Sequence, residues 1–269
     1  MVSYMMGSQN DIAKIFKALH RPGDPIILTN VWDAISAKAV AALPETRALA
    51  TASYAVAVAA GLEDPELTLE VNLRGAAAVA KIAKAFDKPL TVDFQDGYGE
   101  QLEEGVKTLL EIGAVGINLE DFSRERDALY DVGEAVERVK TVLRVAAEAG
   151  VPDFVVNART DALVAGHPVE EAVKRGKAYL EAGATTAFIW GGREKGGTTR
   201  VEVEKEAKEL GGRLNVSLVR VVPGGLTVDE LREIGGVGVA RISVGPQLMM
   251  RSVGAVAEEA GKILRGEGL

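Results

Sequence analysis

The sequence predicts a single (β/α)8 barrel of the TIM type, which is an α/β fold. Short β-branched runs alternate about eight times with longer Ala-, Glu- and Lys-rich helical patterns along the 269 residues. Such an alternation gives a parallel sheet covered by helices, and α/β barrels commonly have about 250 residues. The first strand is followed by Leu28-Thr-Asn-Val-Trp-Asp33. It therefore lacks the G-x-G-x-x-G turn that opens many doubly wound sheets.

Eight strands are expected, and most of them are apolar runs bounded by Gly, Pro or Asp, as strands require. The runs are Ile26–Leu28, Ala48–Ala52, Leu90–Val92, Val115–Leu119, Phe154–Val156, Thr185–Ile189, Leu214–Leu218 and Val237–Ile242. Helical patterns lie between them.

Three of the expected helices end at a shared signal. Glycine follows the helix and precedes the strand in Glu111-Ile-Gly-Ala, Glu148-Ala-Gly-Val and Glu181-Ala-Gly-Ala, and glycine readily adopts the left-handed conformation that ends a helix.

The expected helices are eight in all. They cover Ala34–Ala42, Leu67–Ala85, Leu102–Ile112, Val132–Ala149, Val169–Ala182, Val201–Leu210, Val228–Ile234 and Pro246–Ile263. No linker or shift in composition interrupts the chain, so we expect one domain over residues 1–269, with residues 1–22 as an N-terminal helical extension.

The composition excludes several classes of protein. The charge sum is 31 − 39 = −8, which argues against a broad nucleic-acid surface, because phosphate binding needs clustered Lys and Arg. Cysteine is absent, so disulfides, thiolate metal sites and a cysteine nucleophile are excluded. Neither a secretory signal over Met1–Asn10 nor an apolar run long enough to cross a bilayer is present. We therefore expect a cytoplasmic protein without nucleic-acid or membrane partners.

Polar residues follow the predicted strands at the end where a barrel gathers its chemistry. Residues two apart on a strand share a face, which gives the pairs Asp93 with Gln95, Asn118 with Glu120 and Asn157 with Arg159. If these pairs point inward, one bowl holds two carboxylates with amide oxygens, a set that suits Mg²⁺. The guanidinium of Arg159 offers a planar fork for a substrate carboxylate or phosphonate. The alternative is that such residues only cap helices.

Several motifs fall in order over about Leu28–Arg251. Asp93-Phe-Gln-Asp-Gly-Tyr-Gly99 is similar to an Asp-x-Asp-x-Gly-Tyr-Gly signature, and Leu119-Glu-Asp121 and Asn157-Ala-Arg-Thr-Asp-Ala162 are similar to two further ones. The stretch Thr51–Tyr54 with Gly61–Asp64 is similar to a substrate loop that ends in an aspartate. On these motifs the chain resembles the isocitrate lyase/phosphoenolpyruvate mutase superfamily.

The resemblance implies a barrel that commonly exchanges its last helix between subunits, so we expect a homo-oligomer, either a tetramer or a helix-swapped dimer. It implies Mg²⁺ at the mouth, a small α-keto acid or related carboxylate as substrate, and an enolate-like species. It also implies three sets of residues by position. These are the metal ligands Asp93, Glu120 and Gln95, the catalytic residues Asp64, Glu120 and Arg159, and the substrate-binding residues Ser53, Tyr54, Asn157 and Arg159.

The chain departs from the pattern at three places. Gln95 stands where the second aspartate of the first signature usually stands, which removes a negative charge beside the metal. The segment Phe122–Tyr130 carries neither the Lys-Lys-Cys-Gly-His loop of the lyases nor the corresponding mutase pattern. Trp190 stands where the mutase branch has a histidine.

The first functional hypothesis is a Mg²⁺-dependent enzyme, most simply a carbon–carbon lyase. The alternatives are a phosphonopyruvate-type mutase or hydrolase, which acts on a P–C bond, and a catalytically reduced barrel that binds a metabolite. The charged segment between Asp121 and Val132 is a candidate lid, in which Arg124 or Arg126 reaches the second anionic end of a substrate.

Overall fold

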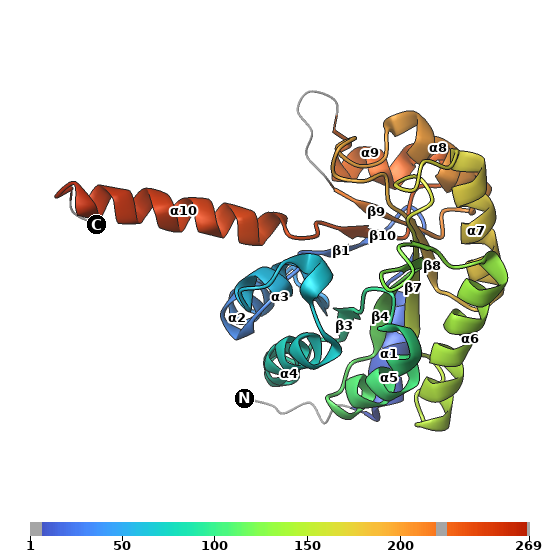
Figure 1. Ribbon diagram of the computed structural model, residues 1–269, viewed down its shortest axis with the longest axis horizontal. Helices are drawn as coiled ribbons and strands as arrows, with labels where there is room; N and C mark the ends of the chain where they lie inside the picture. The colour runs from blue at the N-terminus through green and yellow to red at the C-terminus, as the bar shows by residue number, and fades with distance from the viewer. Residues whose placement is uncertain (1–6, 219–224, 268–269) are drawn as a thin grey trace.

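The computed structural model describes residues 7–218 and 225–267, and its centre is a sheet of eight parallel strands (Figure 1). The order in the sheet is β1-β10-β9-β8-β7-β4-β3-β2. A parallel bridge between Val31 and Thr51 joins the β1 end of the sheet to the β2 end, which completes the barrel. The strands are β1 (Ile26–Leu28), β2 (Leu49–Ala50), β3 (Leu90–Asp93), β4 (Gly116–Glu120), β7 (Val155–Thr160), β8 (Thr186–Ile189), β9 (Leu214–Ser217) and β10 (Arg241–Ser243).

Helices alternate with the strands, and most of them cover the outside of the barrel, whereas the last one projects away from it (Figure 1). They are α1 (Gln9–Ala18), α2 (Ala34–Ala41), α3 (Ser53–Ala59), α4 (Leu69–Ala85), α5 (Leu102–Glu111), α6 (Val132–Glu148), α7 (Val169–Glu181), α8 (Arg200–Glu209), α9 (Val228–Glu233) and α10 (Gln247–Leu264). The expected barrel is confirmed. No helix in the described ranges is both long and apolar enough to cross a membrane.

Two elements were not expected from the sequence. The residues after the second strand, which we expected to be a loop, form α3 from Ser53 onward. The expected lid contains a short antiparallel hairpin of β5 (Phe122–Ser123) and β6 (Ala128–Leu129). Both elements are too short to show a hydrophobic period in the sequence.

The helix α1 lies at the amino ends of the strands and fits against an inward-facing glycine. A Cβ built on Gly116 would lie 3.0 Å from Cε1 of Phe16 and 2.8 Å from the carbonyl oxygen of Val155. Phe16 is fully buried. The absence of a side chain at Gly116 therefore lets α1 close this end of the barrel.

The outer layer of the barrel contains one buried carboxyl group without a hydrogen-bond partner among the described residues. Glu206 of α8 is 1% exposed, and neither of its side-chain oxygens has a partner. Burial, helped by the charge of Glu202, raises the pKa of Glu206 from 4.5 to about 8. Its contribution to stability is therefore complete below about pH 4.5 and is lost as the pH rises through 8.

Replacing Glu206 by glutamine is expected to remove this pH dependence. At pH 8 the variant should be more stable than the wild type by about 2 kcal/mol or more, because the neutral amide avoids the burial of a charge. At pH 4.5 the two should be similar. Calorimetric unfolding at both pH values measures this, with Glu204→Gln on the exposed face of the same helix as the control. Equal melting temperatures at pH 8 would contradict the prediction.

Candidate active site

The carboxyl ends of β3, β4 and β7 bring the expected polar residues together at the mouth of the barrel. Asp93 is in register with Asn118, which is in register with Asn157. Two residues further along, Glu120 is in register with Arg159. Residues in register on adjacent strands lie side by side. The structure therefore places these side chains in one row, as the strand pattern predicted.

A chain of hydrogen bonds runs across four strands and ends at Asp93. The hydroxyl of Thr186 donates to Oδ1 of Asn157 (2.6 Å), and Nδ2 of Asn157 donates to Oδ1 of Asn118 (2.8 Å). Nδ2 of Asn118 then donates to Oδ1 of Asp93 (3.0 Å), while the backbone N–H of Ser53 donates to Oδ2 (2.8 Å). These contacts fix the Asp93 carboxylate, and each of its oxygens keeps a lone pair for a further partner.

Arg159 lies between two carboxyl groups. Its Nη1 donates to Oε1 of Glu120 (2.7 Å), and its Nε and Nη2 donate to the two oxygens of Asp161 (2.8 and 3.0 Å). The guanidinium carbon lies 5.8 Å from the ring centroids of both Phe188 and Trp190. Three of the five N–H groups are thus used within the protein, and two remain for a substrate.

The carboxyl groups around Arg159 resist ionisation. Burial raises the pKa of Glu120 to about 8; Arg159 acts against this shift, and the charges of Asp161 and Asp93 add to it. The pKa of Asp161 is also raised by burial. Glu120 and Asp161 share a single guanidinium, so burial shifts both carboxyl groups toward the protonated form. The mouth therefore contains a group that can give or accept a proton.

Gln95 and Asp64 face each other at the rim. Nε2 of Gln95 donates to the backbone oxygen and to Oδ1 of Asp64, both at 3.1 Å. Arg124, from the hairpin after β4, donates to Oδ2 of Asp64 at 3.1 Å and also to its backbone oxygen. The carboxylate of Asp64 is thus already bound on both oxygens. Of the two candidates for reaching a substrate, Arg124 contacts Asp64 and Arg126 contacts Glu134.

The alternation that paired Gln95 with Asp93 does not extend to this residue. β3 ends at Asp93, and Gln95 has the left-handed φ of 50°. Its amide therefore turns to Asp64, while its buried Oε1 has no partner among the described residues. The carboxylate of the next residue, Asp96, is directed elsewhere, because its Oδ2 accepts from the hydroxyl of Tyr130 at 3.0 Å.

Ser53 and Tyr54 occupy the first turn of α3, where we expected a loop. Ser53 contributes its backbone N–H to Asp93. Tyr54 packs near Ala52 and Met249, and the guanidinium carbon of Arg193 lies 4.8 Å from its ring centroid. Of the two residues expected to provide donors, Ser53 thus reaches the site through its backbone.

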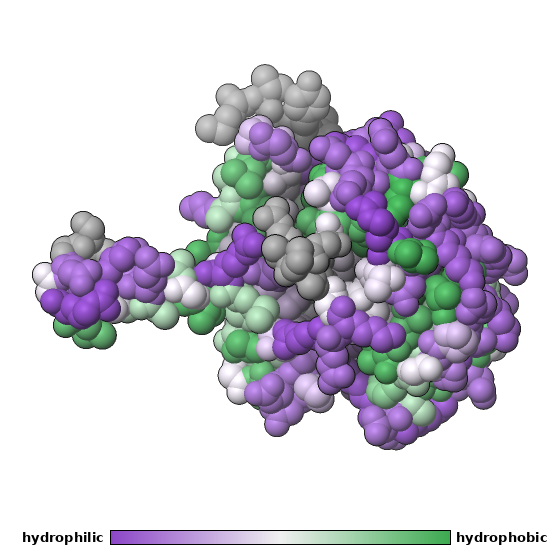
Figure 2. Space-filling view, turned by 90° about the horizontal axis from the view of Figure 1, so that it is seen from above, coloured by the Kyte–Doolittle hydropathy of each residue, from purple (hydrophilic) through white to green (hydrophobic). Residues whose placement is uncertain are grey.

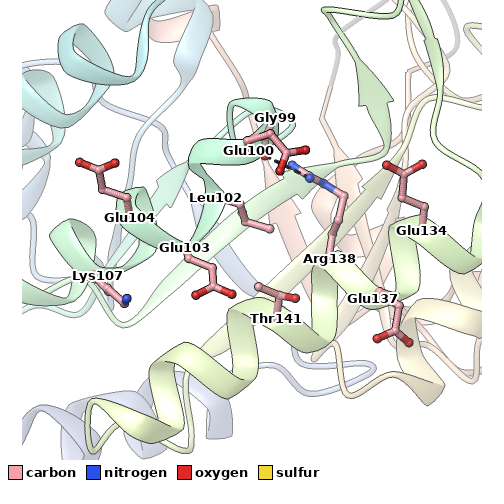
Figure 3. Close-up of a pocket in the computed structure, with 10 residues that line it drawn as sticks. All are labelled: Gly99, Glu100, Leu102, Glu103, Glu104, Lys107, Glu134, Glu137, Arg138 and Thr141. Atoms are coloured by element: carbon pink, nitrogen blue, oxygen red, sulfur yellow. Dashed lines mark hydrogen bonds between the residues drawn. The ribbon is translucent and has the colours of Figure 1, made fainter.

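A separate cavity of about 600 Å³ lies outside the barrel between α5 and α6 (Figure 3). Arg138 lines it and donates to the backbone oxygen of Gly99 (3.2 Å) and to that of Asp96. Its guanidinium carbon lies 4.5 Å from the ring centroid of Tyr130. Arg138 thus holds the turn that follows β3, and the cavity is distinct from the mouth.

The residues at the mouth fit Mg²⁺. No three His, Cys, Asp or Glu side chains in the described ranges form a ready metal cage. Mg²⁺ is commonly held by one or two carboxylates together with water and substrate oxygens. Asp93, which has a free lone pair on each oxygen, is suited to be a direct ligand. The unpartnered Oε1 of Gln95 adds a neutral oxygen.

Residues 16–264 match the model of the phosphoenolpyruvate phosphomutase family. The chain belongs to this family. It is also 30% identical to an uncharacterized protein of Mycobacterium tuberculosis (strain H37Rv) over 257 residues, which are 94% of this chain and 90% of that protein. The predicted membership of the isocitrate lyase/phosphoenolpyruvate mutase superfamily is therefore confirmed.

Relatives in the superfamily catalyse different reactions. A phosphonopyruvate hydrolase of Variovorax sp. (strain Pal2) is 32% identical over 70% of this chain and 66% of its own length. The 2-methylisocitrate lyase of Escherichia coli (strain K12) is 28% identical over 71% of this chain and 64% of its own length. The crystal structure of a 2,3-dimethylmalate lyase matches with a TM-score of 0.81 and 25% identity, covering 96% of this chain and 89% of that one. The superfamily thus includes lyases, mutases and hydrolases.

The sequence did not single out one residue at the mouth and one buried inside the barrel. Asn118 was placed on the correct face, but its contact with Asp93 depends on strand register, which the sequence does not show. Arg241 is a charged residue inside the predicted strand Val237–Ile242. That position was the available signal, because a charge within a buried strand is unusual.

Proposed function

We propose that this protein is a Mg²⁺-dependent lyase that cleaves a carbon–carbon bond of a small α-keto acid or related carboxylate. The observation that carries this proposal is the buried carboxyl group of Glu120, which contacts Arg159 at the same barrel mouth as Asp93 and whose pKa burial raises. Cleavage next to a carbonyl leaves an enolate, which must be stabilised and then protonated. The mouth offers groups for both tasks.

Each residue has a role in this proposal. Mg²⁺ would supply a Lewis acid that stabilises negative charge on the enolate oxygen, and Asp93 would hold it with the neutral oxygen of Gln95. The two free N–H groups of Arg159 would grip a substrate carboxylate. Asn157 would position Asn118, and through it Asp93, by the row of hydrogen bonds. Asp64 would cover the substrate from the rim, where Arg124 and Gln95 hold it.

Glu120 would replace the thiol that the related lyases carry after the fourth strand. The chain has no cysteine, so the acid–base group must be another residue. A carboxyl group with a pKa of about 8 is matched to proton transfer near neutral pH. Glu120 would therefore protonate the enolate after the bond has broken.

The second candidate is a hydrolase or mutase that acts on a P–C bond. The 32% identity to the phosphonopyruvate hydrolase of Variovorax favours it. Both candidates share an enolate leaving group and differ in the bond that breaks, so the same site residues would serve.

A substrate panel with product detection tests the proposal. The purified protein is incubated with Mg²⁺ and with 2-hydroxy and 2-keto diacids on one side and phosphonopyruvate on the other. Release of a keto acid from the first group supports the lyase. Consumption of phosphonopyruvate, with release of phosphate by a hydrolase or formation of phosphoenolpyruvate by a mutase, supports the P–C alternative. Oxalate, an enolate mimic, should raise the melting temperature only with Mg²⁺. Turnover of neither group would overturn both candidates, and absence of the oxalate effect would leave the reduced barrel as the explanation.

We also propose that α10 is exchanged with a second copy of the chain. The helix projects from the body as a narrow arm that carries apolar as well as polar surface (Figures 1 and 2). Within it Met249 is buried, whereas Val253 and Val256 are 58% and 69% exposed. The body also exposes Ile27 of β1 and Ile35 of α2. Burial of these side chains against a partner would remove apolar surface from water.

Light scattering during size-exclusion chromatography is expected to show a dimer or a tetramer. Val253→Asp should shift the protein to the monomer, because a charge would then lie in the buried contact. Glu259→Gln on the same helix changes a residue paired with Lys262 and serves as the control. A monomeric wild type at micromolar concentration would contradict the exchange.

A further inference from the structure

Asp121 is buried on the outer side of the barrel, directly after the site residue Glu120. It is 2% exposed, and its Oδ2 accepts hydrogen bonds from the hydroxyl of Tyr179 (2.6 Å) and from Nη1 of Arg175 (3.0 Å). Both partners belong to α7, which packs against β7 and β8 on the outside of the barrel (Figure 1). Asp121 thus faces α7, whereas the adjacent Glu120 contacts Arg159 at the mouth.

Asp121 also holds the end of β7 at two points. Its Oδ1 accepts from the backbone N–H of Asp161 (2.9 Å), and its backbone N–H donates to the carbonyl oxygen of Arg159 (3.0 Å). These two bonds fix the backbone on either side of Thr160. Asp161 in turn binds the guanidinium of Arg159 through both carboxylate oxygens. The position of Arg159 therefore depends on Asp121, and through it on α7.

Arg175 anchors the hairpin that follows β4 as well. Its Nη1 donates to the carbonyl oxygen of Tyr130 (3.0 Å), and the backbone N–H of Tyr130 donates to the carbonyl oxygen of Asp121 (2.8 Å). The hydroxyl of Tyr130 reaches Asp96 in the turn after β3. Asp121, Tyr130, Arg175 and Tyr179 thus form an outer network, which joins the segments that follow β3, β4 and β7.

The outer network lies behind the mouth and is closed to a substrate. Arg175 is 7% exposed and Tyr179 is 1% exposed. The cavity that Tyr179 and Arg159 both line has a volume of about 10 Å³, which is room for no more than one water molecule. A buried ion pair is also weak evidence of a gain in stability, because apolar side chains of similar size often stabilise a fold as well or better. The contacts at Arg159 indicate a different use for this pair.

We propose that Arg175 and Tyr179 of α7 are positioning residues of the active site, which through Asp121 hold Arg159 in the orientation that binds a substrate carboxylate. The inference rests on the proposed function, in which the two free N–H groups of Arg159 bind that carboxylate. A guanidinium that is oriented before the substrate arrives loses less conformational entropy on binding. Without the outer network Arg159 samples more orientations, and the substrate binds more weakly.

Hydrogen exchange at the backbone amide of Asp161, followed by NMR, measures this link without any substrate. Tyr179→Phe removes one hydroxyl, and Arg175→Met removes the buried cation. The Asp161 amide should exchange at least tenfold faster in both variants than in the wild type, because the carboxylate that accepts its hydrogen bond is held less firmly. Lys177→Met is the control, since Lys177 of the same helix forms an exposed pair with Glu209, and it should exchange like the wild type.

Steady-state kinetics with the substrate found in the panel tests the effect on the site. KM should rise at least fivefold in Tyr179→Phe while kcat changes less than twofold, because the carboxylate contact is the same in the ground state and the transition state. Mg²⁺ affinity should be unchanged, because Asp93 is held by Asn118 and Ser53 and not by the outer network. A purely structural defect would instead lower the fraction of active protein, and therefore kcat, at an unchanged KM.

An unchanged exchange rate of the Asp161 amide in folded Tyr179→Phe would overturn the inference. This variant keeps the ring and decides the test even if Arg175→Met fails to fold. Faster exchange with an unchanged KM would also overturn it, because the outer network would then serve the fold alone.

The proposed function can fail separately. If the wild type turns over no substrate of the panel, the affinity for oxalate with Mg²⁺ replaces KM as the measurement. Binding that is at least fivefold weaker in Tyr179→Phe than in the wild type would then support the positioning role. Equal affinity, or no binding by either protein, would overturn it.

Discussion

Replacing Asp93 by asparagine is expected to abolish Mg²⁺ binding and to lower turnover by about a hundredfold or more. A metal ion contributes several kcal/mol to stabilising a developing negative charge, and each 1.4 kcal/mol is a factor of about ten in rate. Asparagine keeps the size of the side chain but loses its charge. Titration calorimetry measures Mg²⁺ binding, and initial rates at saturating substrate measure turnover.

The fold should survive this change. Asp93 lies at the mouth, where side chains contribute little to the packing of the barrel, and its backbone contacts with Thr51 and Asn72 remain. The melting temperature should therefore stay within a few degrees of the wild type. Asp24→Asn is a matched control, because Asp24 pairs with Arg21 before β1, at the opposite end of the barrel. Wild-type turnover in a folded Asp93→Asn would exclude Asp93 as the metal ligand.

Replacing Glu120 by glutamine is expected to remove the proton donor. General acid catalysis contributes about a hundredfold to ten-thousandfold, so kcat should fall by at least about a hundredfold. The pH profile carries a second signature. Glu120 donates only when protonated, and burial raises its pKa to about 8, so wild-type kcat should fall as the pH rises through 8. That decrease should be absent in Glu120→Gln.

Comparing KM with kcat separates the role of Glu120 as a proton donor from a purely structural role. Glu120 also contacts Arg159, so the variant changes KM, whereas a lost proton transfer appears in kcat and in its pH dependence. Glu134→Gln, which removes a surface carboxylate paired with Arg126, should leave both unchanged. A Glu120→Gln profile that keeps the alkaline decrease would assign that ionisation to another group, such as Asp161.

Much of the architecture could be predicted from local chemistry. Apolar residues recur with different periods in strands and in helices, so the two kinds of element could be told apart in the sequence. Glycines such as Gly113, Gly150 and Gly183 adopt positive φ at the helix ends where the sequence predicted them. Because all strands of such a barrel run the same way, residues at their carboxyl ends had to meet. The grouping of Asp93, Glu120 and Arg159 therefore followed from counting strands.

The sequence by itself determined the barrel, the family and the residue types available at the mouth. The tertiary structure decided which of these groups form hydrogen bonds or ion pairs with one another. Register joins Asn118 to Asp93, the left-handed turn at Gln95 directs its amide to Asp64, and Arg159 is shared by two carboxyls. Such contacts join residues tens of positions apart and depend on angles and burial that no local pattern encodes. For the same reason the sequence alone did not distinguish Arg241 from a surface arginine. A charge without a partner costs free energy only where water is excluded, and that depends on the tertiary structure.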